Sequence, residues 1–491
     1  MQQTLLDKAI AYHRDGQLEM ATLTYQEALS ANPDDFNVPH LLGILYLQKK
    51  KFLLAQEMFH KAISLHSDYA QSHFYLSVSF QESGDIDRAI IHLKRALEID
   101  PAYYEANLNL GHIYFNRQTY ELSKLLFEQC VKIDPSRTFA YCELGLTLYF
   151  QDRQNLQHAI NIFDKAIELD SQFAEAHLNK SLVLLSEGRY EEAWPHYEWR
   201  DRTSRNLSRG GYLQLDSEKW IGNQSLSGKT LLLYAEQGLG DSIQFSRYIP
   251  KLAVPGATVF LAVPLPLFNL LSEQNWPITL VPMEAAPLTD FHCPLPSLPH
   301  AFKTSLDTIP HPGFLKYNHD KSAAFRSSDQ AQSDLNIGVF WSSASTYAEN
   351  HLRNIPLEVF SNLFALEGIK WTCLQKVILD KDLEFIQEKT LSVHLPYLDL
   401  VNLSDTAALI SNLDLVITVD TSIAHLSCAL GIPTWILITS IPDWRWMRNR
   451  EDSPWYPTAK LYRQTSPGNW AEVIERVHRD LQVLGNQNIS R

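Results

Sequence analysis

The sequence predicts an α-helical solenoid followed by an α/β region with two parallel-sheet lobes. Three observations support this prediction. The first 200 residues repeat with a period of 34, and from residue 229 onward short β-like runs alternate with amphipathic helices. In addition, 491 residues are too many for one hydrophobic core, so two or three domains are expected.

Composition narrows the class of protein. The net charge of -14 argues against non-specific binding to nucleic acid or to anionic lipid, because both carry the same sign. The 5 cysteines are odd in number and form no CxxC pair, which favours a reducing compartment over a disulfide framework or structural zinc. The longest apolar stretch, Leu261 to Leu271, is interrupted by Pro264 and Pro266 and is too short to span a bilayer. Without a signal peptide in residues 1–30, a cytoplasmic protein is expected.

Several residue classes recur with the repeat. One series of small residues, spaced by 34, comprises Ala9, Gly43, Ser77, Gly111 and Gly145. A second small series comprises Ala21, Ala55, Ala89 and Ser123, then Ala159 and Ala193 after a short insertion. A bulky series comprises Tyr25, Phe59, Leu93, Phe127, Phe163 and Tyr197. The residues that close the units are Pro33, Ser67, Pro101, Pro135 and Ser171.

This pattern predicts stacked helix pairs. Two antiparallel helices approach closely only where both carry small side chains, and the bulky residue fills the adjoining hole. One such pair cannot bury its own apolar face, so copies stack. The residues resemble the tetratricopeptide repeat, with roughly six units across residues 2–200. The groove of such a solenoid is expected to bind a peptide or protein; the alternative is that the repeats serve self-association or cap the second domain.

The second half predicts alternating strands and helices joined by right-handed crossovers. The expected strands are Thr230–Ala235, Thr258–Val263, Ile337–Trp341, Lys370–Leu374, Leu415–Val419 and Thr434–Ile438. The expected helices are Ser242–Leu252, Leu357–Leu366, Thr406–Asn412, Ser422–Leu430 and a closing helix from Trp470. The Pro-rich span from Pro282 to Pro312 divides the two lobes. The resulting domains are a solenoid at 1–200, a linker at 201–228, lobes at 229–315 and 335–469 joined by a linker at 316–334, and a closing segment at 470–491.

The first segment with chemical potential is Gln237-Gly238-Leu239-Gly240-Asp241, between an expected strand and an expected helix. Gly238 and Gly240 allow a sharp turn that brings backbone N–H groups close to a ligand at the positive end of a helix. The segment is not a dinucleotide fingerprint, because the third glycine would fall on Ile243. The simpler interpretation of Asp241 is a helix N-cap.

The second segment runs from Val419 to His425, again where a strand turns into a helix. Thr421 and Ser422, which follow Asp420, supply hydroxyls and free N–H groups suited to a phosphate. His425 lies one turn further along and is a further donor; the alternative is a hydrogen-bonded core histidine. Because ligands of open α/β sheets bind outside the carboxyl ends of the strands, the two segments predict one cleft.

From Lys229 to Arg463 the chain resembles bacterial glycosyltransferases of the GT-B fold, in particular the heptosyltransferase-like domain found with tetratricopeptide repeats. The stretches that carry the resemblance are KTLLLYAEQGLGDSIQFSRYIP, DLVITVDTSIAHLSCALGIPTWIL and DWRWMRNREDSPWYP. The resemblance implies that Asp241 is the general base, and that Thr421, Ser422 and His425 hold the donor diphosphate. A looser similarity to tetratricopeptide-linked O-linked N-acetylglucosamine transferases makes protein acceptors worth testing.

Further contacts are expected around the same cleft, one from the resemblance and the others from their positions at strand ends. Arg353 matches a region where the family carries a basic phosphate contact, although an ordinary surface arginine is the alternative. Trp341 and Ser342 end one expected strand and are predicted to line the cleft. Gln375 and Lys376 end the next and are predicted to face the nucleoside.

Other groups are assigned no chemistry. The DxD patterns at Asp380–Asp382 and Asp85–Asp87 are interpreted as solvated charge rather than as metal ligands. A group of aromatic residues is interpreted as packing between the lobes, with sugar or base stacking as the alternative. Its members are Trp444, Trp446, Trp455 and Tyr456.

The sequence therefore predicts a glycosyltransferase that needs neither a metal ion nor a cofactor. It moves a sugar from a nucleotide-sugar donor to an acceptor, expected to be a polypeptide docked by the repeats. Two alternatives remain. One is a transferase-like but inactive interaction scaffold; the other is a glycan-modifying transferase whose repeats serve assembly.

Overall fold

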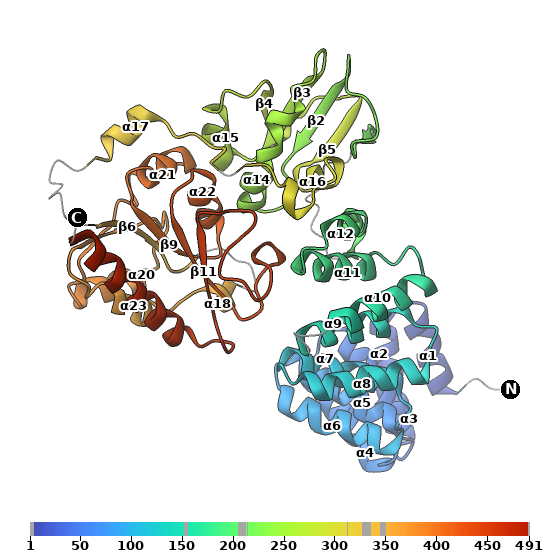
Figure 1. The fold of residues 1–491 in the computed structure, drawn as a ribbon. Coiled ribbons are helices and arrows are strands. Elements are labelled where there is room, and N and C mark those ends of the chain that lie inside the picture. The colour runs from blue at the N-terminus through green and yellow to red at the C-terminus, as the bar shows by residue number, and fades with distance from the viewer. Residues whose placement is uncertain are drawn as a thin grey trace. The chain divides into compact units, whose positions relative to one another are not determined.

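The computed structural model describes residues 4–151, 156–204, 213, 215–311, 313–326, 335–343 and 350–489. The chain forms two compact units, Met1–Asn179 and Lys180–Arg491, which are described separately below. The first is a helical solenoid, and the second is an α/β region with parallel sheets (Figure 1).

The first unit is a series of helix hairpins. Its helices are α1 (Leu5–Arg14), α2 (Leu18–Ala31), α3 (Asn37–Gln48), α4 (Phe52–Leu65), α5 (Ala70–Glu82), α6 (Ile86–Ile99), α7 (Tyr104–Asn116), α8 (Tyr120–Ile133), α9 (Thr138–Gln151) and α10 (Leu156–Leu169). Each odd-numbered helix packs on the next even-numbered one, and each pair packs on the following pair. Only a few residues separate the two helices of each hairpin, so the paired helices run antiparallel. This arrangement is the one that the 34-residue period predicts.

The small and bulky series meet inside each hairpin. A Cβ placed on Gly111 would lie 2.6 Å from Cε1 of Phe127, and a Cβ on Gly43 would lie 2.7 Å from Cε1 of Phe59. Both phenylalanines are fully buried. A glycine on the first helix is therefore what allows the ring on the second helix to fill the space between them.

The last repeat helix belongs to the second unit. Helix α11 (Ala174–Ser186) crosses the boundary, and α12 (Tyr190–Tyr197) and the short helix η1 (Glu198–Arg202) follow it. Trp194 Nε1 donates to the Thr304 carbonyl at 2.8 Å, and Trp455 Nε1 donates to the Tyr190 hydroxyl at 2.7 Å. All three aromatic side chains are buried. The sequence alone places this helix with the solenoid, whereas its packing joins it to the α/β region.

The first sheet of the second unit is parallel, with strand order β1-β5-β2-β3-β4. Its strands are β1 (Glu218–Lys219), β2 (Thr230–Tyr234), β3 (Thr258–Val263), β4 (Thr279–Pro282) and β5 (Phe291–Pro294). The associated helices are α14 (Leu239–Phe245), η2 (Ser246–Leu252), α15 (Leu265–Ser272), η3 (Met283–Ala285), η4 (Leu295–Ser297), α16 (Leu298–Ala301) and η5 (Leu306–Thr308). Strand β5 lies in the Pro-rich span, and β1 lies in the segment that the sequence assigns to a linker.

The second sheet is also parallel, with strand order β11-β10-β9-β6-β7-β8. Its strands are β6 (Leu335–Phe340), β7 (Ile369–Cys373), β8 (Val393–His394), β9 (Leu415–Val419), β10 (Thr434–Ile438) and β11 (Ala459–Arg463). The associated helices are α17 (His319–Ala324), α18 (Asn350–Arg353), α19 (Leu357–Phe360), η6 (Ser361–Leu363), α20 (Asp380–Glu388), α21 (Leu403–Ile410), α22 (Ser422–Ala429), η7 (Trp444–Trp446) and α23 (Trp470–Ile489).

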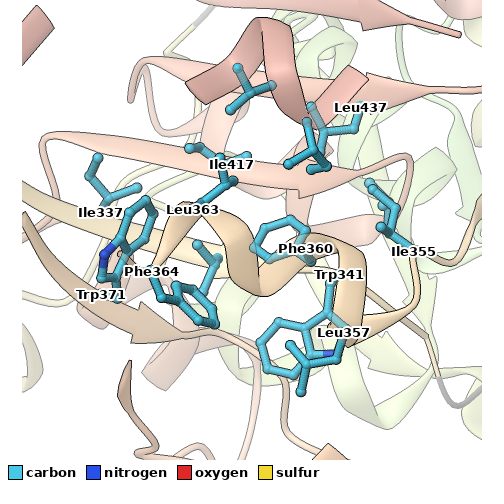
Figure 2. Close-up of a cluster of buried hydrophobic side chains, with 14 of the residues drawn as sticks. Ile337, Trp341, Ile355, Leu357, Phe360, Leu363, Phe364, Trp371, Ile417 and Leu437 are labelled. Atoms are coloured by element: carbon cyan, nitrogen blue, oxygen red, sulfur yellow. The ribbon is translucent and has the colours of Figure 1, made fainter. Parts of the chain in front are cut away.

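The core of the second sheet lies between its strands and helices α19, η6 and α23. In Figure 2, Ile337 and Ile417 from neighbouring strands lie over Phe360 and Leu363. All four side chains are fully buried. Central parallel strands are covered on both faces, which is why β6, β9 and β10 are rich in apolar residues and do not alternate with polar ones. This core fixes the carboxyl ends of the strands, where the candidate site lies.

Candidate functional site

The two predicted strand-to-helix segments pack against each other. Helix α14 follows β2 in the first sheet, helix α22 follows β9 in the second, and the two helices are in contact. A Cβ on Gly240 would lie 2.6 Å from Cδ2 of His425. Gly240 is therefore needed for the close approach of the two helices, in addition to any role toward a ligand.

A cavity of about 510 Å³ opens beside this contact. Its walls come from both sheets, because Leu239 and Leu265 follow β2 and β3, while Phe340 and Leu374 end or follow β6 and β7. The polar residues that line it are Ser342, Lys376, Asn402, Thr406 and Ser422. The structure thus brings three predicted residues, Ser342, Lys376 and Ser422, to one cavity. Lys376 Nζ donates to the Val401 carbonyl at its rim.

Asp241 lies in the first turn of α14, and both of its carboxylate oxygens have partners. The Gly238 N–H donates to Oδ2 at 2.8 Å, so the side chain caps the helix. Arg445 Nη2 lies 2.5 Å from Oδ1. The side chain keeps 22% of its surface exposed. Burial raises the pKa of Asp241, and the Arg445 charge opposes that rise.

Arg445 is a residue that the sequence reasoning assigned no role. Its side chain is 6% exposed and pairs with Asp241 on one side and with Asp443, at 2.8 Å, on the other. Its Nε donates to Oε1 of Gln244, on α14, at 2.6 Å. Burial alone would raise the pKa of Asp443, but the Arg445 cation holds it below its usual range. The only signal in the sequence was the stretch around Trp444, quoted above for its resemblance.

A second acidic group lies at the end of β9. Arg353 Nη1 donates to the Asp420 backbone carbonyl at 3.4 Å, so α18 is tied to the start of α22. The Asp420 side chain is buried, and burial together with the Asp443 charge raises its pKa to about 6. Arg353 opposes that rise. The predicted neighbourhood of Arg353 and the β9–α22 turn is therefore present.

The start of α22 provides hydroxyl groups. Thr421 is the N-cap residue, and its Oγ1 is buried without a hydrogen-bond partner among the described residues. His425 is buried, lies 3.0 Å from the Tyr456 hydroxyl through Nδ1, and stacks on Trp446. Burial lowers the pKa of His425 to about 3, so its imidazole is neutral. These contacts are those of the core histidine, while a donor bond to a phosphate stays a prediction.

Trp341 does not line the cleft as predicted. It is fully buried in the core (Figure 2). Its Nε1 donates to Oδ2 of Asp382 at 2.8 Å. Asp382 is therefore a buried acceptor rather than a solvated charge. Gln375 is buried as well, and its Oε1 accepts from the N–H groups of Trp341 and Ser342 at 3.0 and 3.2 Å. Its Nε2 has no hydrogen-bond partner among the described residues.

The aromatic group is packing. Trp444, Trp446, Trp455 and Tyr456 are all buried. Trp444 and Trp455 lie edge-on or tilted against Tyr190, so the group holds α12 in place. Within the described residues, no cluster of histidine, cysteine or acidic side chains has a geometry suited to a metal ion. None of the helices described is long and apolar enough to cross a membrane.

Models of two known families match parts of the chain. Residues 384–446 match the model of glycosyltransferase family 9 (heptosyltransferase). Residues 3–35, 79–118, 104–137 and 144–198 match tetratricopeptide-repeat models. The chain combines tetratricopeptide repeats with a heptosyltransferase-family domain. The matched part of this domain contains the Asp420–His425 segment and Arg445.

Individual relatives cover different parts of the chain. Protein FlbA of Caulobacter vibrioides is 25% identical over 504 residues, which is 96% of this chain and 82% of FlbA. The UDP-N-acetylglucosamine--peptide N-acetylglucosaminyltransferase of Giardia intestinalis is 23% identical over 185 residues, 36% of this chain but 12% of that enzyme. Among solved structures, MamA is 23% identical with a TM-score of 0.32 and covers 35% of this chain and 92% of MamA.

Proposed function

We propose that the protein is a glycosyltransferase that moves a sugar from a nucleotide-sugar donor to a polypeptide acceptor, in a GT-B cleft and without a metal ion. The observation that carries the proposal is the cavity of about 510 Å³ that Leu239 and Ser422 both line. On one side it is lined by Leu239, in the same first turn of α14 as Asp241, and on the other it reaches the helix start expected to hold a diphosphate. This supports a donor site close to the proposed base.

The departing diphosphate is stabilised by protein groups. Ser422 begins α22, where free backbone N–H groups and the helix dipole favour a negative charge. The Thr421 hydroxyl, buried and without a partner in the part of the chain that the structure describes, is a further donor. Arg353 adds positive charge, and together these groups take the place that a metal ion has in other transferases.

Asp241 removes the acceptor proton. Each carboxylate oxygen has one partner and keeps a second lone-pair site. Burial raises its pKa, which brings the carboxylate closer to the range in which a general base works well. Arg445 keeps the group ionised and oriented.

The repeats bind the acceptor. The printed name of the Giardia intestinalis relative describes transfer to peptide, which supports a polypeptide acceptor here. Partly exposed residues recur in one register on the first helices of successive hairpins, and we expect them to contact the acceptor. They are Leu41, Tyr75, Asn109 and Glu143.

The first experiment incubates the full chain with a panel of nucleotide sugars and measures binding and nucleotide release. Release with at least one donor is expected. If no donor binds, the proposal is wrong. Binding without turnover in the presence of acceptors indicates an inactive scaffold instead.

The second experiment replaces Asp241 by Asn. Transfer is expected to fall by about 10²–10⁴-fold, because the change removes the carboxylate that takes up the proton. Binding of the nucleotide sugar is expected to be kept, because Asp241 does not contact it in this proposal. Asp405 provides a matched control. It also lies in the first turn of its helix, accepts the Asn402 N–H at 3.0 Å and pairs with Lys321 at 2.9 Å. Asp405→Asn therefore loses the same kind of ion pair and, like Asp241→Asn, keeps an oxygen that can cap its helix. Equal loss of transfer in both variants removes the base assignment.

The third experiment replaces Asn109 by Ala in the full chain. A rise in KM for a polypeptide acceptor, with donor turnover onto water unchanged, is the expected result. If a glycan acceptor reacts equally well with both proteins and no polypeptide reacts, the repeats serve assembly instead.

A further inference from the structure

The segment after the last repeat helix is bonded to the loop that leads into α14, the helix whose first turn carries Asp241. Arg200, on η1, donates from Nε and Nη2 to the two carboxylate oxygens of Glu236, at 2.8 and 2.7 Å. The two side chains are 1% and 0% exposed. Glu236 stands two residues after β2 and two residues before Gly238. The ion pair therefore joins η1 to the start of the β2–α14 loop.

A second contact reaches the next residue of the loop. Gln237 Nε2 donates to the hydroxyl of Tyr197, the last residue of α12, at 3.1 Å. Tyr197 is buried. Glu236 and Gln237 are thus both fixed from outside the loop, and the following Gly238 N–H is the group that bonds Asp241 at 2.8 Å.

The Arg200 pair is built to hold one geometry. The planar guanidinium matches the carboxylate through two parallel bonds, which a lysine cannot reproduce. The same guanidinium also donates to the Tyr197 carbonyl, to Glu198 and to the Ser297 hydroxyl. A carboxylate this deeply buried is costly without its counter-ion. A lysine would keep the charge but not the two parallel bonds, so Glu236, and the loop with it, would be held less firmly in one position.

We propose that Arg200 is a positioning residue for sugar transfer, which acts through Glu236 to hold the β2–α14 loop so that Asp241 reaches the acceptor. The inference rests on the proposed function of Asp241. It also makes the last repeat part of the catalytic half, since α12 and η1 lead directly to this ion pair. A displacement of the base by about 1 Å is enough to slow a reaction by about 10²-fold.

The test uses Arg200→Lys in the full chain and reports kcat, donor KM and amide hydrogen exchange of residues 236–242. The expected result is a kcat lower by about tenfold or more, a donor KM within about twofold, and amide exchange in the loop faster by about tenfold. Lys219→Gln is the matched control. Lys219 pairs with Glu198 at 2.8 Å and with Asp201 at 3.3 Å, in the same segment but not on the loop. This control is expected to keep kcat within about threefold and to leave loop exchange unchanged.

The outcomes separate the inference from the proposed function. Unchanged kcat and unchanged loop exchange in Arg200→Lys overturn the positioning role even when the wild type is an active transferase. An equal fall of kcat in Lys219→Gln overturns it too, because the effect is then one of general packing. If the wild type turns over no donor, the proposed function fails, and loop exchange alone decides whether Arg200 orders the loop. If Arg200→Lys does not fold, Glu236→Gln, which keeps Arg200 bonded to Ser297, is measured in the same way.

Discussion

Replacing Arg445 by Gln removes the cation shared by two carboxylates of the candidate site. Arg445 Nη2 lies 2.5 Å from Asp241 and Nη1 lies 2.8 Å from Asp443, and the Arg445 side chain is 6% exposed. Glutamine has neither the positive charge nor the planar guanidinium that pairs with both carboxylates. Asp241, 22% exposed, and Asp443, 39% exposed, are both left without their counter-ion, so the cost depends on how much water still reaches each carboxylate.

The magnitude follows from that partial exposure. Removing one partner of a fully buried pair costs about 3–5 kcal/mol of unfolding free energy, and because water still reaches both carboxylates here, a loss of about 2 kcal/mol is expected. The loss also depends on pH, because the Arg445 charge lowers the pKa of both Asp241 and Asp443. Without it, both folded-state pKa values rise, and the folded variant binds protons more tightly than the unfolded chain does. The deficit relative to wild type is therefore largest at high pH and shrinks as the pH falls through the raised pKa values.

The assay is urea unfolding of the full chain at pH 8, 7 and 6, followed by tryptophan fluorescence, which reports the second unit. Arg450→Gln is the control, since Arg450 pairs with Asp452 at 2.7 Å and their side chains are 34% and 66% exposed. Its loss is expected to be about 0–1 kcal/mol and nearly independent of pH. The reasoning is refuted if Arg445→Gln loses no more stability than this control, or if its deficit grows as the pH falls.

Two predictions concern the repeats. Burial lowers the pKa of His40 to about 4, so below pH 6.5 the unfolded chain takes up a proton that the folded repeat does not. By pH 5 this lowers the free energy of unfolding by about 2 kcal/mol. His40→Gln should therefore reduce the pH dependence of the urea midpoint. Gly111→Ala places a Cβ 2.6 Å from the Phe127 ring and should cost about 1–3 kcal/mol. Adding Phe127→Leu should restore part of the lost stability, because the neighbouring hairpin has Ser77 and Leu93 at the corresponding positions. If urea unfolding shows no recovery in the double variant, this account of the packing is wrong.

The sequence predicts the regular parts of this fold because they repeat or are long apolar runs. The 34-residue period locates the hairpins, and the strands β2, β3, β9 and β10 are located to within a residue. It misses β5, Phe291–Pro294, which lies in a Pro-rich span although it pairs with both β1 and β2. Proline usually argues against an inner strand, and here one ends it. Strands this short carry too few residues to show a pattern.

The candidate site was predictable where the signal is local. Asp241 and Ser422 follow strands and begin helices, so their neighbourhood could be inferred from position alone. The misplacement of Trp341 has a physical cause. Side chains alternate between the two faces beyond β6, so Phe340 and Ser342 line the cavity while Trp341 points into the core. The two-residue period of a strand therefore distinguishes Trp341, on the core side, from Phe340 and Ser342, on the cavity side.

The pairs that hold the site were not predictable, because they join residues far apart in the chain. Arg445 reaches Asp241 across about 200 positions, and Arg200 reaches Glu236 from a segment that the repeat pattern assigns to the solenoid. The two arginines hold the same short stretch, one at the start of the β2–α14 loop and one in the first turn of α14. Neither the 34-residue repeat nor the helix and strand periods of the sequence indicate which distant residues form such an ion pair.

This arrangement changes how acceptor docking has to be tested. A fragment that begins at residue 201 lacks Arg200, and it also lacks Tyr190 and Trp194, whose removal uncovers Trp444 and Trp455. Glu236 would be left buried without its cation. Such a fragment is expected to lose transfer whether the acceptor is a polypeptide or a glycan. Substitutions on α3, α5, α7 and α9 in the full chain leave these contacts intact, so only they separate the docking role of the repeats from the structural role of the last one.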